Sequence, residues 1–300
     1  MQIRFLEYLI ALSQEGHFAR AAQRCNVSQP ALSAGLVALE ELLGARLVDR
    51  DRRYQGLTAQ GKAMLPWAQQ MVAAHKGLTT AISLVDGPLT GTLRIGTVPA
   101  AVPVMGDLTR ALRTLHPSLR LSIRSMTSSA ISQGLAAYEL DAGVTYIDHE
   151  PPADVVSVDL YTETHRFLVA QSYPRRFGDV IDLADALDQP LCLLHQGMHN
   201  RRILDGQLAK HGLTADPGVL ADSFEALIAT IASGAYATIL PDSYGMMLPS
   251  WAKTSSLAPG LAPCQIGLVV SDRKPFSPLS EAALALAKRI STPELSRRYD

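Results

Sequence analysis

The sequence predicts an α/β protein with a small helical domain at its N-terminal end, a long connecting helix and a larger α/β body of two subdomains. Three observations predict this arrangement. Apolar residues at helical spacing dominate the first 90 residues, a GPLTG segment interrupts the chain at 87–91, and short apolar strands alternate with helices from there on. The composition, 47% hydrophobic and 18% charged over 300 residues, is typical of a globular protein.

The first two helices are predicted from apolar spacing and from the residues that end each helix. Apolar residues repeat at helical spacing over residues 5–12, and Gly16 is expected to end this helix. A second helix is expected over about 18–25. Asn26 follows it, and Asn tolerates the left-handed conformation that a tight turn between helices requires.

A third helix is predicted to begin after Ser28, which caps it, with Pro30 in its first turn. Its buried side is expected to consist of Ala31, Leu32, Leu36 and Leu39. Gln29 and Ser33 then face outward, as in a helix-turn-helix whose second helix enters the DNA major groove. Gln pairs with adenine there, and Ser contacts bases or phosphates. An ordinary helical hairpin with a solvated polar face would show the same spacing.

A β-wing is predicted after Gly44, with strands near 46–49 and 55–57. The tip between them carries Arg50, Arg52 and Arg53. Arginines at such a tip suit contact with phosphates or with an adjacent minor groove. The alternative is a solvated hairpin in which Asp49 and Asp51 pair with these arginines.

A long helix is predicted after Thr58, which is placed to cap it, with Pro66 near its start. Apolar residues recur along it in alternating steps of four and three: Met64, Ala68, Met71, His75, Leu78, Ile82 and Val85. All of these except His75 are candidates for a seam along which two chains dimerise. Alternatively, this face of the helix packs on the chain's own body.

The remaining two thirds are predicted to form an α/β body with mainly parallel sheets. The expected strands are TLRIGTV, LRLSIRSM, DAGVTYI, RFLVAQ, PLCLLH, ATILP and QIGLVV, and the expected helices lie near 104–115, 129–138, 200–211, 224–233 and 279–290. We expect the chain to cross between two subdomains near 160 and 267. Subdomain I then spans about 91–160 and 268–300, and subdomain II about 161–267.

A ligand site is expected in the crevice outside the carboxyl ends of the strands. Four loops there lead into helices, and their candidate effector-binding residues are Thr97, Pro99, Ala100, Thr127, Ser128, Ser129, His195, His199, Arg201, Ser223 and Phe224. Helix N-termini with hydroxyl groups suit a small carboxylate or similar anion. For each Ser or Thr alone, helix capping is the alternative role.

The segment FARAAQRCNVSQPALSAGLVALEELLGARLVDR, followed by LTAQGKAMLPWAQQM, resembles the winged helix-turn-helix and linker helix of LysR-type transcriptional regulators. The resemblance implies a DNA-binding domain at 1–58, a dimerising linker at 59–90 and a periplasmic-binding-like (type 2) effector domain at 91–300. It carries over Ser28, Gln29, Pro30, Ser33 and Arg50 as DNA-facing residues and Arg52 and Arg53 as wing contacts. The implied partners are double-stranded promoter DNA, a small-molecule effector and RNA polymerase. The chain is also expected to form a homodimer or a homotetramer.

Two departures from the family pattern are visible. Ala34 and Gly35 stand where the family commonly has a basic or polar pair, and Val48 replaces a Phe before the wing. Gly35 lowers helix stability by roughly 1 kcal/mol relative to Ala. Because Ala34 has no polar side chain, no base contact is expected from position 34.

Few features of the sequence support other classes of function. The net charge is −1, with a mild basic excess in residues 1–62. The three cysteines, Cys25, Cys192 and Cys264, lie among apolar residues without a CxxC motif, which favours buried free thiols over an oxidant sensor. No catalytic motif or three-ligand metal site is evident, so neither an enzyme nor a metal or cofactor is expected.

The sequence shows no signal peptide or membrane span, which predicts a cytoplasmic protein. We therefore expect a transcriptional regulator controlled by a small metabolite. The alternatives are a constitutive DNA-binding regulator without a functional effector site, and a solute-binding receptor.

Overall fold

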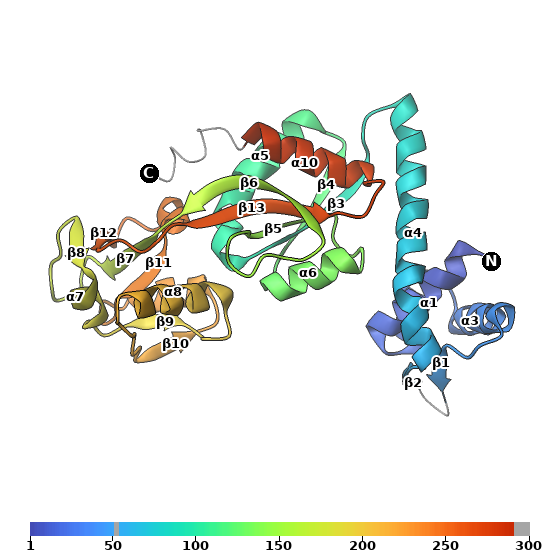
Figure 1. Cartoon of the computed structure of the whole chain (residues 1–300), viewed down its shortest axis with the longest axis horizontal. Coiled ribbons are helices and arrows are strands. Elements are labelled where there is room, and N and C mark those ends of the chain that lie inside the picture. Colours follow the sequence, from blue (N-terminus) through green and yellow to red (C-terminus); the bar gives the residue numbers. More distant parts are fainter. Residues whose placement is uncertain (51–53, 291–300) are drawn as a thin grey trace. The chain divides into compact units, whose positions relative to one another are not determined.

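The computed structural model describes residues 1–50 and 54–290, and Figure 1 traces the chain. The chain divides into two compact units, one made of Met1–Leu89 with the short segment Ala136–Glu139, and a larger one made of Thr90–Leu135 and the chain from Leu140 onward. Each unit has its own hydrophobic core.

The first unit contains the predicted helices and hairpin. Its elements are α1 (Ile3–Glu15), α2 (Phe18–Arg24), α3 (Gln29–Leu43), β1 (Val48–Arg50), β2 (Tyr54–Leu57) and α4 (Ala59–Asp86). Gly16 ends α1 with φ 61°, and Asn26 has φ 55° at the turn before α3, so both predicted left-handed positions are confirmed. The side chains of Ser28 and Thr58 cap α3 and α4 as predicted, each accepting a hydrogen bond from a first-turn N–H.

The core of the first unit joins α1, α2 and α3. Its fully buried leucines are Leu6, Leu9, Leu12, Leu32, Leu36 and Leu39. Ala31 was expected among them but is exposed, because successive helical residues turn by about 100° and Ala31 falls outside the stripe that runs through Leu32. Gly35 is buried instead. Each buried leucine stabilises the fold by about 1.5–3 kcal/mol.

A buried carboxylate attaches the wing to α3. Oε1 of Glu40 accepts hydrogen bonds from the backbone N–H groups of Leu47 at 2.9 Å and Val48 at 3.1 Å. Strands β1 and β2 are antiparallel, with Val48 opposite Leu57. Strand β1 begins two positions after the predicted start at 46. The wing tip at 51–53, including Arg52 and Arg53, lies outside the described residues.

Subdomain I of the second unit is a five-stranded sheet covered by helices. Its elements are β3 (Gly91–Thr97), a 3-10 helix η1 (Pro99–Val104), α5 (Met105–Leu115), β4 (Leu119–Ser125), α6 (Ser128–Ala136), β5 (Ala142–Tyr146), β6 (Val155–Glu163), β13 (Cys264–Ser271) and α10 (Pro278–Ile290). The strand order is β4-β3-β5-β13-β6. In Figure 1, α5 and α10 lie on one face of this sheet and α6 on the other.

Subdomain II has a four-stranded and a two-stranded sheet. Its elements are β7 (His165–Ala170), β8 (Val180–Asp182), α7 (Leu183–Leu187), β9 (Cys192–Leu194), α8 (His199–Lys210), β10 (Val219–Ala221), α9 (Phe224–Ile231), β11 (Thr238–Pro241), a 3-10 helix η2 (Asp242–Met247) and β12 (Ala252–Ala258). The strand orders are β11-β7-β12-β8 and β10-β9.

The α/β class and the five predicted helices of the body are confirmed, but the expectation of mainly parallel sheets is wrong. Strand β3 is parallel to β4 and β5, whereas β13 is antiparallel to β5 and β6, and β7 is antiparallel to β11 and β12. The long strands β6 and β13 carry the chain out of and back into subdomain I, so they run in opposite directions. The crossings therefore fall at Thr164 and at 259–263, a few residues from the predicted 160 and 267.

Candidate functional site

The N-terminal end of α3 presents polar and small residues to solvent. Gln29, Pro30 and Ala31 are exposed, and Ser33 is half-buried. The Ser28 hydroxyl oxygen accepts a hydrogen bond from the Ala31 N–H at 3.3 Å, which leaves the hydroxyl proton available to a second partner. The predicted DNA-facing residues of this helix are thus together on one accessible end.

The close approach of α3 to α1 explains one departure from the family pattern. A Cβ placed on Gly35 would lie 2.7 Å from Cε2 of Tyr8 and 2.9 Å from Cδ1 of Phe5. Only glycine allows these two aromatic rings of α1 to pack against the backbone of α3 here. Ala34, the other departure, is exposed.

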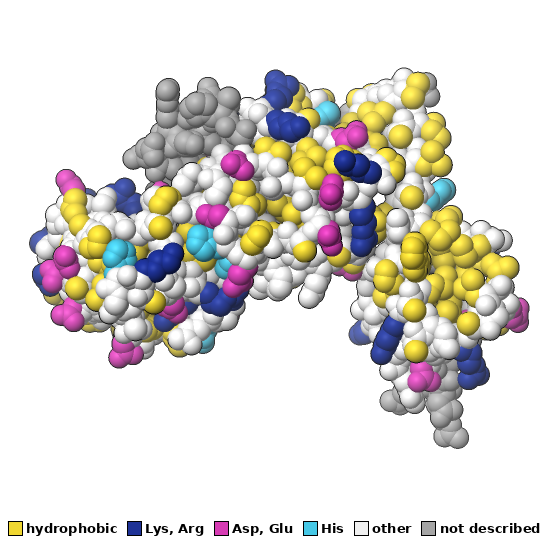
Figure 2. Space-filling model, in the orientation of Figure 1, with side chains coloured by type: hydrophobic (Ala, Val, Ile, Leu, Met, Phe, Trp, Pro, Cys, Tyr) yellow, Lys and Arg dark blue, Asp and Glu magenta, His cyan; other side chains and the backbone are white. Residues whose placement is uncertain are grey.

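The predicted dimerisation seam of α4 divides into two parts. Ala68 is fully buried in the core of its own unit, with Met64 packed partly against that core, because this end of α4 covers α1. The expectation that Ala68 lies in the seam is therefore wrong. Beyond it Met71 is 40% exposed, Leu78 and Ile82 are each 60% exposed and Val85 is 83% exposed. Figure 2 shows apolar side chains along this part of α4.

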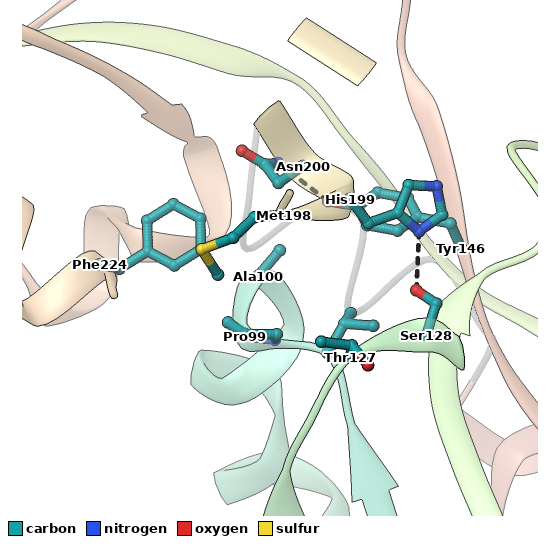
Figure 3. Close-up of a pocket in the computed structure, with 10 residues that line it drawn as sticks. Pro99, Ala100, Thr127, Ser128, Tyr146, Met198, His199, Asn200 and Phe224 are labelled. Atoms are coloured by element: carbon teal, nitrogen blue, oxygen red, sulfur yellow. Dashed lines mark hydrogen bonds between the residues drawn. The ribbon is translucent and has the colours of Figure 1, made fainter. Parts of the chain in front are cut away.

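The second unit contains a pocket between its two subdomains. It encloses about 330 Å³ of space, part of it open to solvent, and Figure 3 shows the side chains around it. The lining residues are Val98, Pro99, Ala100, Thr127, Ser128, Tyr146, Met198, His199, Asn200 and Phe224.

Six of the eleven predicted effector residues line this pocket: Pro99, Ala100, Thr127, Ser128, His199 and Phe224. The other five do not, for separate reasons. Thr97 is fully buried. The Ser129 hydroxyl is hydrogen-bonded to the Thr127 hydroxyl, and the Ser223 hydroxyl caps α9 by accepting from the Ala226 N–H. His195 is exposed outside the pocket. Arg201 is 2% exposed and turns inward to bond Asp205 and the Leu194 carbonyl.

Sequence reasoning missed Val98, Tyr146, Met198 and Asn200. Val98, Met198 and Asn200 adjoin predicted residues in the same loops, so examining every residue of those loops would have found them. Tyr146 is the last residue of β5, another strand end facing the crevice, and that position was a usable signal.

Four helices begin at the pocket. The first residues of η1, α6, α8 and α9 are Pro99, Ser128, His199 and Phe224, and all four line it. The first-turn N–H groups of a helix have no acceptor within the helix, and its N-terminal end carries a partial positive charge. These helix ends favour negative charge at the pocket, although most of its accessible lining is apolar and no Arg or Lys lines it.

His199 is held by hydrogen bonds from subdomain I. Its Nδ1 lies 2.7 Å from the Ser128 hydroxyl, which in turn accepts from Thr145 at 3.1 Å. Its ring packs against Tyr146 with centroids 4.8 Å apart. Burial lowers the pKa of His199, with a smaller opposing effect from Glu150, so the ring is neutral at pH 7. Ser128 then donates to Nδ1, and Nε2 carries the ring proton.

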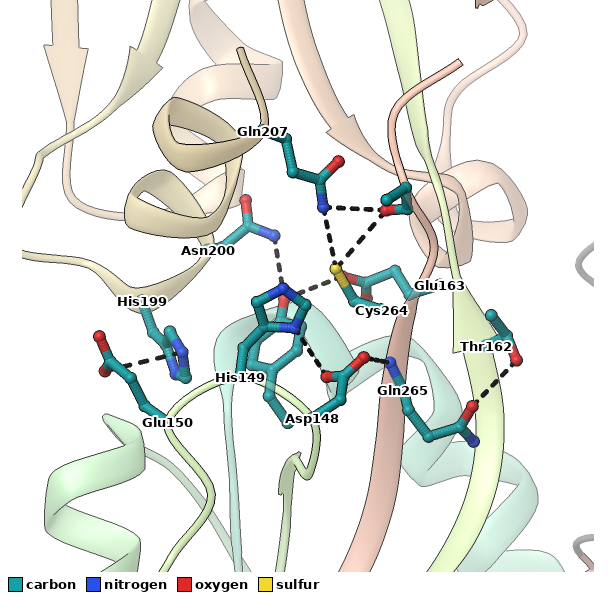
Figure 4. Close-up of polar contacts among 12 residues, drawn as sticks. Asp148, His149, Glu150, Thr162, Glu163, His199, Asn200, Gln207, Cys264 and Gln265 are labelled. Atoms are coloured by element: carbon teal, nitrogen blue, oxygen red, sulfur yellow. Dashed lines mark hydrogen bonds and ion pairs between the residues drawn. The ribbon is translucent and has the colours of Figure 1, made fainter. Parts of the chain in front are cut away.

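Glu150 connects the rim of the pocket to α8. Its carboxylate accepts a hydrogen bond from Arg202 Nη2 at 2.6 Å. It also lies 3.7 Å from His199 Nε2, a contact drawn in Figure 4. The hydrogen bond from Arg202 lowers the pKa of Glu150. Because Glu150 follows β5 and Arg202 is on α8, the contact joins the two subdomains.

A buried polar chain lies behind the pocket, where the chain crosses between subdomains (Figure 4). The Tyr146 hydroxyl donates to Glu163 Oε1 at 2.8 Å and accepts from Asn200 Nδ2 at 2.9 Å. Burial raises the pKa of Glu163 to about 8 and lowers that of His165 to about 4. Both groups are therefore predominantly uncharged at neutral pH.

The three cysteines are free thiols in surroundings that disfavour the thiolate form. Cys192 and Cys264 are fully buried, and burial raises the pKa of each, that of Cys264 to about 12. Cys25 is half-buried in the first unit, and its pKa is also raised by burial. A thiol with a raised pKa is a poor nucleophile, so the expectation of inert cysteines agrees with these surroundings.

Comparison with known proteins identifies the family. The model of the LysR substrate binding domain matches residues 86–290, and that of the bacterial regulatory helix-turn-helix protein, lysR family, matches residues 3–62. Among the described residues, no helix is long and apolar enough to cross a membrane.

Curated relatives and solved structures agree with this match. The chain is 29% identical to the DNA-binding transcriptional dual regulator OxyR of Escherichia coli K12, covering 97% of this chain and 95% of that protein. It is 31% identical to the SDS degradation transcriptional activation protein of a Pseudomonas species, covering 99% of each. A full-length OxyR variant from Pseudomonas aeruginosa superposes with a TM-score of 0.77 at 26% identity, covering 99% and 97% of the two chains. The structure of CbnR complexed with its target DNA has the same fold, with a TM-score of 0.66 at 23% identity and coverage of 97% and 100%. The chain belongs to the LysR family of DNA-binding transcriptional regulators.

Proposed function

We propose that this regulator binds a small organic anion in the pocket between subdomains I and II, and that occupancy of the pocket changes how the protein binds promoter DNA. The convergence of four helix N-termini on one pocket carries the proposal. A ligand changes DNA binding only to the extent that it favours one arrangement of the protein over another.

The lining supports an anion with a single charge and an apolar body. The Thr127 hydroxyl and the first-turn N–H groups are suitable donors to a carboxylate, and the Ser128 hydroxyl contributes by holding the ring of His199 through its hydrogen bond to Nδ1. Val98, Met198 and Phe224 offer apolar contact on the other side. Because no Arg or Lys lines the pocket, a second negative charge would lack a cationic partner, which is costly in a buried site.

For DNA recognition, we propose that α3 enters the major groove with Gln29 and Ser33 toward the bases. The exposure of Gln29 and Pro30 supports this, as does the cap at Ser28 that fixes where the helix begins. We also propose that the exposed part of α4, from Met71 to Val85, pairs with a second copy of the chain. A dimer would place two recognition helices on half-sites about 34 Å apart.

Several relatives are named hydrogen peroxide-inducible genes activators. In this chain Cys192 and Cys264 are buried with raised pKa values, which supports recognition of an intact small molecule over thiol oxidation. Replacing all three cysteines with alanine should leave the response of DNA binding to the effector unchanged. Loss of the response in a folded triple variant would favour thiol chemistry.

Isothermal titration calorimetry with a panel of small monocarboxylates tests the effector proposal. We expect at least one to bind the wild type and to bind Ser128→Ala at least tenfold more weakly. Ser132→Ala is the matched control, because Ser132 is on the same helix and outside the lining. If no acid binds, the alternative of a constitutive regulator gains support. Equal losses in both variants would mean that α6, and not the Ser128 hydroxyl, was disturbed.

A further inference from the structure

We propose that the effector carries a hydroxyl group in addition to its acidic group, and that the side-chain carbonyl of Asn200 is the group that selects it. The inference rests on the proposed function, an organic anion in this pocket, and specifies the chemical class: a small hydroxycarboxylic acid.

The amide of Asn200 is oriented by two acceptors on the same side. Its Nδ2 lies 2.9 Å from the Tyr146 hydroxyl oxygen and 3.4 Å from His165 Nε2. The Tyr146 hydroxyl donates its proton to Glu163, so its oxygen accepts from Asn200. An amide nitrogen has two protons, and these two acceptors match them.

The buried surroundings keep both acceptors in the required state. His165 is uncharged because burial lowers its pKa to about 4, so one ring nitrogen has a free lone pair, and the neighbouring amide N–H assigns it to Nε2. Glu163 is fully buried and accepts from Tyr146. Turning the amide over would place the Asn200 oxygen against the Tyr146 oxygen, whose proton is already donated to Glu163, and would remove the 2.9 Å hydrogen bond from Nδ2.

The Asn200 carbonyl is therefore directed away from this chain. Asn200 is only 7% exposed, yet it lines the pocket, and no described residue donates a hydrogen bond to its Oδ1. Figure 3 shows this oxygen on the side of Asn200 away from Tyr146, toward Phe224. A carbonyl of a largely buried residue that opens into a pocket, with no donor from the described residues, favours a ligand that supplies a hydrogen-bond donor.

The charges around the pocket favour a hydroxyl over an ammonium group as that donor. No carboxylate lines the pocket, and Glu150 at its rim is already paired with Arg202. A buried ammonium would lack a counter-charge, whereas a hydroxyl needs only the carbonyl. The acid group and the hydroxyl then lie on different parts of one small molecule, with its apolar carbons against Met198 and Phe224.

Matched pairs of acids test this inference by calorimetry on the full chain. The probes are butanoate with 2- and 3-hydroxybutanoate, 3-phenylpropanoate with 3-phenyllactate, and benzoate with 3- and 4-hydroxybenzoate. We expect the hydroxy acid of at least one pair to bind the wild type about tenfold or more tightly than its partner. Asn200→Leu, of similar size, should reduce that advantage to below about threefold, measured as the ratio of the two affinities within the same variant.

The control variant is Gln207→Leu, which replaces a buried amide on the same helix outside the pocket and should retain the preference. Tyr146→Phe removes one of the two acceptors and should weaken the preference without abolishing it. Two results would overturn the inference while leaving the anion pocket intact. One is that hydroxylated and unhydroxylated acids bind the wild type equally well. The other is that the preference for the hydroxy acid persists in folded Asn200→Leu. Failure of every acid to bind would overturn both proposals.

Discussion

The backbone of Gly35 on α3 lies against the ring of Tyr8 on α1, so closely that a Cβ at position 35 would lie 2.7 Å from Tyr8 Cε2. The two helices therefore meet where the sequence departs from the family pattern. This contact holds the recognition helix on the core of its unit, and it makes glycine a packing requirement.

Gly35→Ala should destabilise the first unit by about 1–3 kcal/mol, because overpacking outweighs the gain of roughly 1 kcal/mol in helix propensity. Hydrogen exchange of the α1 and α3 amides measures this locally. The matched control is Gly77→Ala in α4, where a Cβ meets no atom within 4 Å. That variant should be neutral or more stable. Unchanged exchange in Gly35→Ala would show that the rings of Tyr8 and Phe5 move aside freely.

Gln29→Ala should lower affinity for the cognate operator by about 1–3 kcal/mol and relax base preference at one position. The reason is the loss of a bidentate contact from an exposed side chain at the start of α3. Fluorescence anisotropy with operator and scrambled DNA measures both effects. Gln171→Ala, an exposed glutamine in the second unit, serves as the control. Wild-type affinity for the operator would exclude base reading by Gln29.

Arg53→Ala should weaken binding to every DNA sequence alike and reduce the salt dependence of affinity by about one unit of slope. Arg53 lies outside the described residues, and the prediction comes from its place in the wing. Anisotropy titrations at several salt concentrations provide the slope. An unaltered slope would mean that Arg53 contacts no phosphate.

Glu163→Gln should make stability less dependent on pH. Burial raises the pKa of Glu163 from 4.5 to about 8, so the folded protein holds a proton that the unfolded chain has released. The contribution of Glu163 to stability is therefore present below about pH 4.5 and is lost as the pH rises to about 8. The variant keeps an oxygen acceptor for Tyr146 and cannot ionise.

At pH 8 we expect Glu163→Gln to be more stable than the wild type, by about 1.4 kcal/mol for each unit of pKa shift that it removes. Urea denaturation from pH 5 to pH 8 measures this difference. His165, whose pKa is lowered to about 4, destabilises the folded protein as the pH falls below 6.5, but it is present in both proteins and cancels in the difference. Parallel pH profiles would contradict a proton on Glu163.

The sequence by itself determined the features that depend on local chemistry. The left-handed Gly16 and Asn26, the caps Ser28 and Thr58, and the longer helices of both units follow from apolar periodicity and from residues that satisfy helix ends, whereas the short α7, η1 and η2 were not predicted. The loops at the pocket were also predictable, because ligand crevices lie at the carboxyl ends of strands. Strands β6, β8, β10 and β12 were not predicted, although in β6 Val156, Val158 and Leu160 alternate with polar residues, a signal that was available.

Only the tertiary structure decided which side chains of those loops meet. Each helical residue turns by about 100°, so His199 and Asn200 line the pocket while Arg201, the next residue, turns into the protein. Ala68 was assigned to a dimer seam because heptad spacing does not say which helix a face will pack against. The orientation of the Asn200 amide depends on Tyr146 and His165, which are far from it in sequence and close to it only in the folded chain.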